Sequence, residues 1–250
     1  QDLLKADVVM VSDTAMFAHG VPSICYGLRG LAYFQLDLQG AHTDLHSGSF
    51  GGTVVNPAFE LSKILTAMKD DTGRITIPHF YDDVRELTER ERTEFARLPF
   101  DESTYKQALG LKELSGEEGC TPLERLWVRP TFEINGLESG FTGKGAKTVL
   151  PAKAMAKVSM RLVPDQDPEK IVDLFEDYVH ALTPSSVHLE TTRMHGGKPW
   201  VASLDHPALR AATQAIKKGF GKKPVFQREG GSIPVVATFA ELLNIPSVLM

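Results

Sequence analysis

The sequence predicts an α/β domain that is interrupted by an α+β domain with the element order of the ferredoxin-like fold. An apolar strand pattern near the start and a strand–helix alternation after Trp200 are typical of an α/β sheet. Between them the predicted order is β-α-insertion-β-β-α-β, which forms a four-stranded antiparallel sheet with both helices on one face. The resulting division is an α/β part at 1–27 and 200–250, an interrupting domain at 28–199, and an insertion within it at about 71–126.

The spacing of apolar residues defines the elements of the first half. Residues 8–11 predict a short buried strand, and residues 32–38 alternate as a half-buried strand does. A polar loop follows at 40–52, and Asn56-Pro57 predicts the start of a helix because Pro is favoured at the first helical position. Within the charged insertion, residues 85–96 predict a solvated helix. The apolar face expected for the helix after Asn56 consists of Phe59, Leu61, Ile64, Leu65 and Met68.

The second half continues with two strands, a helix and a strand. The strands are expected at 127–134 and 152–163, and the last one at 186–191. Asp167-Pro168-Glu169 predicts a helix start, with an Asp cap and Pro at the first position. After residue 200 we expect helices at 207–220 and 233–243 and strands at 225–226 and 247–250.

The composition argues against several classes of protein. The 250 residues carry 27 basic and 32 acidic side chains, a net charge of −5, whereas a nucleic-acid interface needs a basic stripe. No run approaches the roughly 20 apolar residues of a membrane span, and the first residues lack a signal-peptide pattern. Two cysteines are typical of a reducing compartment rather than a disulfide framework. We therefore expect a cytoplasmic protein without nucleic-acid or membrane partners.

Both ends of the chain run in apolar strand patterns. Residues 245–250 form a buried-type strand pattern that no polar tail follows. Chains normally end at exposed, polar positions. We therefore expect this chain to be a piece of a longer protein.

The glycine-rich segment 140–148 nearly matches a phosphate-binding loop. That motif needs Gly-Lys-Ser/Thr followed by a helix. Here Ala146 intrudes into the pattern, and Val149-Leu150-Pro151 cannot start the helix. The segment therefore argues against nucleotide binding.

His42 and His46 are four residues apart, a spacing that suits zinc when both lie on one helix. The zinc-protease pattern has Glu after the first His, where this sequence has Thr43. Glycines at 48, 51 and 52 also favour a loop. Two ordinary loop histidines are therefore the favoured interpretation from these residues alone.

Three further positions leave a functional and a structural interpretation open. Asp13 follows a predicted strand, where it suits either a metal ligand or a helix cap. Gly230-Gly231-Ser232 precedes a predicted helix and suits either anion binding or simple capping. Arg161, near the end of an apolar strand, suits either a two-pronged clamp on a carboxylate or a cap on the sheet.

Taken together, eight sequence blocks resemble one family. The residues of these blocks, and the order of the blocks along the chain, closely resemble those of the M20 metallopeptidases. Within that family they most resemble the cytosolic dipeptidase and carnosinase branch. The resemblance extends over essentially the whole chain. The blocks are Val11-Ser12-Asp13, Tyr26-Gly27-Leu28-Arg29-Gly30, Asp44-Leu45-His46-Ser47-Gly48, Gly51-Gly52, Gly145-Ala146-Lys147-Thr148-Val149-Leu150-Pro151, Arg161-Leu162-Val163-Pro164, His195-Gly196-Gly197-Lys198-Pro199-Trp200 and Arg228-Glu229-Gly230-Gly231-Ser232-Ile233-Pro234.

The resemblance implies a zinc-peptidase-like α/β catalytic domain, of which this chain holds a portion, interrupted by a ferredoxin-like lid that forms a homodimer. It also implies two zinc ions, a water that bridges them and a Glu general base. The implied reaction is hydrolysis of dipeptides or short peptides with a free C-terminal carboxylate. Of the family's metal ligands only Asp13 has a counterpart here. We therefore expect the chain by itself to be inactive and to bind no zinc stably, because each zinc needs three or four ligands.

The resemblance also implies roles for the remaining residues. His46 supplies a hydrogen bond to the tetrahedral oxyanion, reaching from one subunit's lid into the partner's site. Arg161, Thr148 and His195 hold the carboxylate end of the substrate, and Gly231 and Ser232 form the matching anchor. Glu229 meets the free amino group of the substrate. Two alternatives remain, namely an amidohydrolase that removes acyl groups from amino acids and a non-catalytic dimerising lid module.

Overall fold

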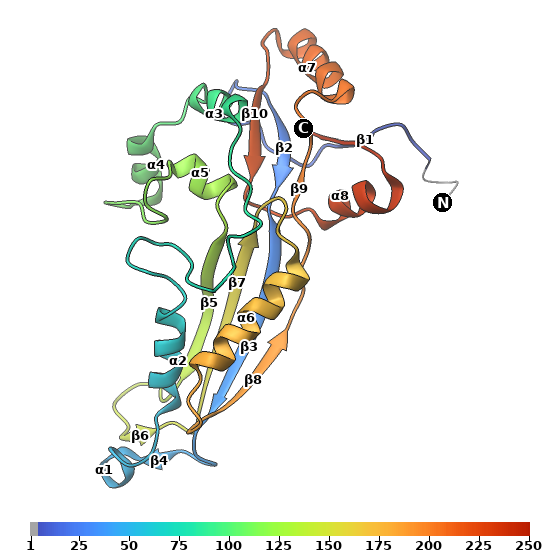
Figure 1. Ribbon diagram of the computed structural model, residues 1–250. Helices are drawn as coiled ribbons and strands as arrows, with labels where there is room; N and C mark the ends of the chain where they lie inside the picture. Colours follow the sequence, from blue (N-terminus) through green and yellow to red (C-terminus); the bar gives the residue numbers. More distant parts are fainter. Residues whose placement is uncertain (1–4) are drawn as a thin grey trace.

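The computed structural model describes residues 5–250, which form two larger β-sheets joined end to end and a small two-stranded sheet (Figure 1). The first sheet has the order β1-β11-β2-β10, and β9 pairs with β2. It is mixed, because β11 runs parallel to β1 and antiparallel to β2. All of its strands come from residues before 29 or after 199. They are β1 (Val9–Val11), β2 (Ser23–Leu28), β9 (Trp200–Val201), β10 (Val225–Glu229) and β11 (Ser247–Leu249).

The second sheet is antiparallel and has the order β5-β7-β3-β8. Helices α2 (Pro57–Thr66) and α6 (Pro168–Leu182) cover one of its faces, as Figure 1 shows. The antiparallel sheet with both helices on one face is the ferredoxin-like arrangement predicted from the order of the elements. The strands are β3 (Gly30–Gln39), β5 (Thr131–Ser139), β7 (Lys153–Leu162) and β8 (His188–Arg193).

The alternation of β3 places its even-numbered side chains in the core beneath the helices. Phe34, Leu36 and Leu38 are buried, while the odd-numbered residues between them are half-buried on the open face. Phe34 packs against Phe175 of α6 with ring centroids 4.5 Å apart. Asp167 caps α6 by accepting from the Glu169 N–H, as its sequence predicted.

The insertion bridges the two sheets. Its first part adds Ile75, Ile77 and Phe80 to the core of the four-stranded sheet. Its helices α3 (Glu89–Ala96) and α5 (Pro122–Trp127) pack on the five-stranded sheet instead. There Phe95 and Leu123 join a cluster with β2 and with helix α7 (Pro207–Phe220). Helix α4 (Glu102–Leu109) lies between them in the chain and has no buried residue.

Several sequence predictions were wrong in detail. The strand expected at 127–134 begins only at Thr131, because Trp127 belongs to helix α5. A capping box formed by Thr121 and Glu124 starts this helix. Strand β2 was not predicted, although all six of its residues are buried. The first strand was expected to be buried, but Met10 is 62% exposed because β1 lies at a sheet edge. Phe59 was expected on the apolar face of α2 and is 68% exposed.

The loops also differ from expectation. The loop expected at 40–52 contains β4 (Leu45–His46) and the single-turn helix α1 (Ser47–Phe50). The glycine-rich segment 140–148 is an exposed connection that leads into strand β6 (Val149–Leu150), and no helix follows it, as predicted. The helix expected at 233–243 consists of α8 (Pro234–Thr238) and a π-helical turn η2 (Phe239–Leu243).

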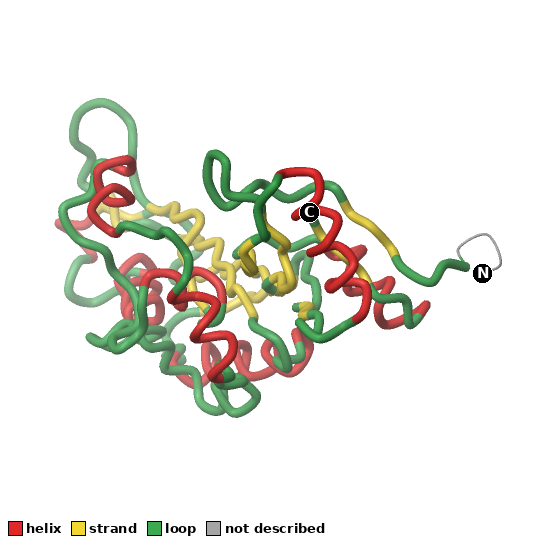
Figure 2. The backbone as a smooth tube through the Cα atoms, turned by 90° about the horizontal axis from the view of Figure 1, so that it is seen from above, coloured by secondary structure: helices red, strands yellow, loops and turns green. Residues whose placement is uncertain are grey.

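The C-terminal residue lies beside β1. The Met250 N–H donates to the Val11 carbonyl, and β1 pairs with β11. Seen from above, the C-terminus and β1 therefore lie toward the same end of the molecule (Figure 2). Among residues 5–250, no helix has the length and apolar character that crossing a bilayer requires.

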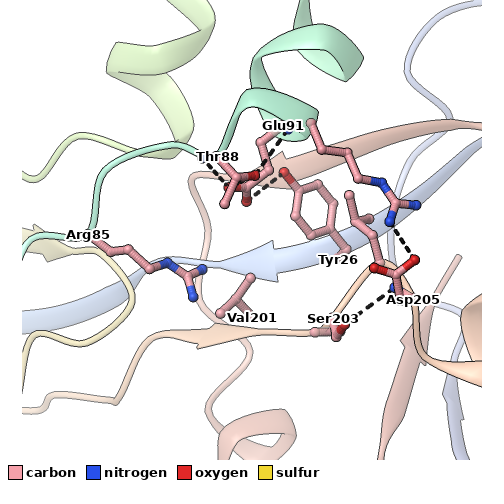
Figure 3. A pocket seen from close by; sticks show the side chains of 10 residues that line it. Tyr26, Arg85, Thr88, Glu91, Val201, Ser203 and Asp205 are labelled. Atoms are coloured by element: carbon pink, nitrogen blue, oxygen red, sulfur yellow. Dashed lines mark hydrogen bonds and ion pairs between the residues drawn. The ribbon is translucent and has the colours of Figure 1, made fainter.

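A buried ion pair ties the insertion to the five-stranded sheet. Arg228 of β10 contacts the Glu91 carboxylate of α3, and their side chains are only 5% and 7% exposed. The Tyr26 hydroxyl donates to Glu91 Oε1 at 3.3 Å, beneath a pocket of about 410 Å³ (Figure 3). Burial opposes ionisation of Glu91, but hydrogen bonds from Thr88 and the charge of Arg228 outweigh it and hold the pKa of Glu91 below its usual value.

We expect Glu91→Met to lower the free energy of unfolding by about 3–5 kcal/mol, because it leaves Arg228 buried without a partner. The double variant Glu91→Met with Arg228→Met should be more stable than Glu91→Met alone. Urea unfolding at pH 7 measures both. Because the folded pKa of Glu91 is lowered, its contribution is complete above the ordinary Glu pKa of about 4.3 and is lost as pH falls below it. A double variant less stable than the single one would contradict this account.

Candidate functional site

The chain passes from one sheet to the other through a single residue. Arg29 lies between the end of β2 and the start of β3. The return crossing lies beside it, where the backbones of Leu31 and Gly197 exchange two hydrogen bonds of 2.9 Å. A side chain on Gly30 would place its Cβ 2.7 Å from Gly197 O and from Pro199, so only glycine fits there. The two crossings therefore form one tightly packed junction.

Arg161 reaches across this junction. It pairs with Leu31 in the antiparallel ladder, while its neighbours Met160 and Leu162 point into the core, so Arg161 lies on the open face of the sheet. Its Nη1 donates to Ser232 Oγ at 3.1 Å, and Ser232 belongs to the loop after β10 in the other sheet. The contact therefore joins the two sheets through a guanidinium and a hydroxyl.

Ser232 is not a helix cap. The capping position of α8 is Ile233, and no side chain caps this five-residue helix. The Ser232 hydroxyl instead donates to the Arg29 carbonyl at 2.6 Å while it accepts from Arg161. Gly231 beside it is exposed, and a Cβ there would meet no atom within 4 Å. The simple capping interpretation of this segment was wrong.

Glu229 and Asp13 lie near one another at the same end of the five-stranded sheet. Burial raises the pKa of Glu229, and the negative charge of Asp13 raises it further. The segment after β1 is held there because the Ala15 carbonyl accepts from Ser23 Oγ at 3.1 Å and from Gln227 Nε2 at 3.2 Å. Asp13 itself is exposed.

The described residues do not form a complete metal site. Over residues 5–250, no group of three or more His, Cys, Asp and Glu side chains gathers closely enough to hold an ion. Asp13 is available as one oxygen ligand, whereas a zinc site needs three or four protein ligands. His42 and His46 do not share a helix, because His42 precedes β4 and His46 ends it.

His195 lies on the open face near the junction. Its ring stacks on Tyr33 of β3, with centroids 5.3 Å apart and an interplanar angle of 24°. The Met194 N–H donates to the Tyr33 carbonyl at 2.8 Å, which holds the segment against β3. His195 is exposed, so its ring nitrogens are accessible to a ligand.

His46 lies in a separate place with Thr148. Its Nδ1 accepts from the Gly48 N–H at 3.1 Å, and its Nε2 lies 3.1 Å from Thr148 Oγ1. A Cβ on Gly48 would lie 2.8 Å from the ring, so glycine lets the backbone approach His46. Because Nδ1 accepts a backbone hydrogen bond, the neutral ring carries its proton on Nε2. His46 is therefore prepared to donate from Nε2.

The predicted site residues thus fall into two groups at opposite ends of the long sheet. Strand β3 has Leu31 near one end, paired with Arg161, and Gln39 at the other end, paired with Lys153. The eight residue steps between them, at about 3.3 Å each, span about 26 Å. His46 and Thr148 follow the Gln39 end, where β4 pairs with β6 at the foot of Figure 1. His46 lies on β4, and Thr148 directly precedes β6. Arg161, His195, Glu229, Gly231 and Ser232 lie at the other end.

Two residues of the junction group were not predicted individually. Arg29 and Tyr33 contact Ser232 and His195 respectively. Arg29 stands in one of the quoted sequence blocks, but only its position between the two sheets shows what it contacts. Tyr33 gives no signal of its own, because its alternation with Phe34 is that of any half-buried strand.

Comparison with known proteins finds similarity to metallopeptidases over nearly the whole chain. A family model described as a peptidase dimerisation domain matches residues 26–187. The Cys-Gly metallodipeptidase dug1 of Schizosaccharomyces pombe is 37% identical over 243 residues, covering 96% of this chain and 51% of that protein. The Beta-Ala-His dipeptidase of Homo sapiens is 32% identical over 247 residues, covering 98% of this chain and 49% of that protein. The chain therefore spans about half the length of these relatives.

Solved structures agree. An M20 family metallo-carboxypeptidase from Sulfolobus solfataricus matches with a TM-score of 0.90 at 36% identity, covering 99% of this chain and 56% of that one. Human carnosine dipeptidase 1 matches with a TM-score of 0.84 at 29% identity, covering 98% of this chain and 52% of that one.

We expect the neutral His46 ring to be protonated on Nε2 in solution, because the Gly48 N–H occupies Nδ1. Long-range ¹H–¹⁵N correlation spectra above pH 8 report the protonated nitrogen directly. Gly48→Ala should shift this signal, since its Cβ would displace the ring. Gly52→Ala is the matched control, because a Cβ there would meet no atom within 4 Å. A ring protonated on Nδ1 would contradict the assignment.

Proposed function

Because this chain belongs to the M20 peptidase family, we propose that it is part of a metallodipeptidase that hydrolyses dipeptides or short peptides with a free C-terminal carboxylate. The relatives that it matches at about half their length are named as dipeptidases, which favours this reaction over acyl-amino-acid hydrolysis or a non-catalytic lid. The observation that carries the proposal is the contact between Arg161 and Ser232 across the junction. This contact places a guanidinium and a hydroxyl side by side at the junction of the two sheets, where both can bind a carboxylate.

Arg161 and Ser232 would hold the carboxylate of the substrate. A guanidinium offers a planar fork that matches a carboxylate with two parallel hydrogen bonds. Ser232 and the exposed backbone of Gly231 would complete this anchor from the other sheet, and His195 would contact the substrate from the open face. Glu229 would receive the free amino group, since it lies at the same end of the molecule.

We propose two zinc ions for the full-length protein, with Asp13 as one ligand. The relatives are metallopeptidases by name, which supports a metal, and a carboxylate oxygen is a regular zinc ligand. The other ligands would come from parts of the full-length protein that this chain does not contain. The described residues alone do not complete this metal site.

We further propose division into a lid of about residues 28–199 and a catalytic portion of 1–27 and 200–250. The family model for the dimerisation domain covers most of this lid. The unpaired thiols Cys25 and Cys120 support a cytoplasmic location, where a reducing environment keeps them free.

We propose that a second copy of the chain completes each site. In one chain, about 26 Å of β3 separates the Arg161 end from the His46 end. Strand β5 is an edge strand whose outer backbone groups have no strand partner among the described residues. Its Ile134 and Leu137 are 49% and 61% exposed. Unpaired, apolar edges of this kind favour strand pairing with another copy.

Pairing of two β5 strands about a two-fold axis has a direct consequence for the site. Thr131 of β5 lies beside Arg161, and Ser139 lies beside Ala154 at the other end. Antiparallel pairing centred on the middle of β5 places the Ser139 end of one copy beside the Thr131 end of the other. The His46 end of the partner therefore approaches the Arg161 end, where the Nε2 proton of His46 would stabilise the developing oxyanion.

In the full-length protein, we expect Arg161→Lys to weaken hydrolysis of dipeptides with a free C-terminal carboxylate. An ammonium group is a point charge and cannot reproduce the planar fork. The penalty in kcat/KM should largely vanish for C-terminally amidated substrates, which a steady-state panel of matched free and amidated dipeptides measures. Equal losses on both would reduce Arg161 to a structural role and remove the main support for the proposed function.

Light scattering of the 250-residue chain at micromolar concentration should give about twice its 27.4 kDa mass. Leu137→Asp should shift the chain to the monomer, because it places a charge in the proposed edge pairing. Leu242→Asp, at a position 71% exposed on η2, is the matched control and should remain dimeric. A monomeric unaltered chain would rule out this dimer.

A further inference from the structure

Arg29 holds the loop that carries Ser232. Its backbone N–H donates to the Glu229 carbonyl at 3.3 Å, and its Nε donates to the Gly230 carbonyl at 3.1 Å. Its own carbonyl accepts from Ser232 Oγ at 2.6 Å. The packing is close, because a Cβ on Gly230 would lie 2.5 Å from Arg29 Nη2. These three contacts attach the loop that carries Ser232 to Arg29, the residue that joins the two sheets.

No carboxylate of the described residues forms an ion pair with Arg29. Arg29 is only 9% exposed, and among the described residues neither it nor Arg161 lies within 4.0 Å of a carboxylate oxygen. Its Nη1 is buried and has no hydrogen-bond partner in residues 5–250. Burial, and then the positive charge of Arg161, lower the pKa of Arg29 to about 10, while Glu133 opposes this shift. Arg29 and Arg161 both contact Ser232, so two guanidinium groups share the junction. Their mutual repulsion costs free energy.

We propose that Arg29 is a specificity-determining residue, whose charge adds to that of Arg161 so that the junction selects a carboxylate over a neutral group. The inference rests on the proposed function, because it concerns the carboxylate end of the same substrate. An anion bound at Arg161 and Ser232 relieves the repulsion between the two guanidiniums. A neutral amide in the same place does not reduce the repulsion between the two guanidiniums. Arg29 therefore contributes to the preference for a carboxylate over an amide even without touching the ligand.

A merely structural role for Arg29 makes a different prediction. If Arg29 served only to clamp the Gly230 carbonyl, its loss would disturb carboxylate and amide ligands equally. Arg29→Gln keeps an N–H donor on the side chain and removes the charge. Arg29→Lys keeps the charge and removes the planar fork. The two variants therefore separate charge from geometry.

The test measures binding to the 250-residue chain by NMR, following the amide signals of Gly231 and Ser232. The probes are N-acetylglycine and N-acetylglycinamide at constant ionic strength, with circular dichroism to verify the fold of each variant. Arg29→Gln should weaken N-acetylglycine by about tenfold, because it removes a nearby positive charge, and leave N-acetylglycinamide within about twofold. Arg29→Lys should retain most of the preference for the carboxylate. Arg97→Gln, which removes an exposed charge at the end of α3, is the matched control and should bind both probes as the unaltered chain does.

Several outcomes would overturn the proposal. They are an unaltered chain that does not prefer N-acetylglycine, an Arg29→Gln variant that keeps the preference, and equal loss of both probes. If Arg29→Gln does not fold, a folded Arg29→Lys that has lost the preference also contradicts a role for the charge, and one that keeps it supports that role. Because the test measures binding, its failure is distinct from failure of the proposed hydrolysis, which the Arg161→Lys panel tests separately.

Discussion

The ladder between β3 and β7 sets the distance between the two groups of proposed site residues. Ten consecutive pairs, from Gly30 with Leu162 to Gln39 with Lys153, make these two strands the rigid axis of the four-stranded sheet. Arg161 lies near one end of this axis and His46 follows the other. Because the strands are fixed along their whole length, no local rearrangement within one chain brings these residues together. The proposed dimer follows from this separation, and the exposed edge strand β5 offers the surface for it.

The sequence predicted the elements whose local signals and packing agree. Period-two alternation in β3 and the Asp167-Pro168 start of α6 correspond to what the structure shows. Strand β2 was not predicted because it is buried throughout and shows no alternation. Helices α4 and α5 were not predicted because each is short and lies in a highly charged segment. The single-chain separation of Thr148 from Arg161 was also not predictable, because it depends on strand register rather than on composition.

The junction between the two sheets concentrates charge where the chain has least freedom. Gly30, Gly197 and Pro199 pack too closely to admit another side chain at residue 30, so the crossing is held in one conformation. Arg29 and Arg161 meet there without a carboxylate within ion-pair distance in the described part of the chain. A preorganised positive site of this kind needs no rearrangement when an anion arrives. The same contacts that join the sheets would therefore also select the ligand.

The most direct test of the account uses two different chains in one dimer of the full-length protein. One chain carries His46→Ala and the other carries Arg161→Met, and differently tagged copies allow the mixed dimer to be isolated. Dipeptide hydrolysis is then measured below KM. If His46 acts on the partner's site, the mixed dimer has one intact site and recovers about half of the unaltered activity. The His46→Ala homodimer stays lower by about 10²–10³ because it lacks the oxyanion donor, and the Arg161→Met homodimer stays low because it lacks the carboxylate anchor. If His46 acts within its own chain, every site in the mixed dimer keeps one defect, and activity no higher than that of the homodimers would contradict the account.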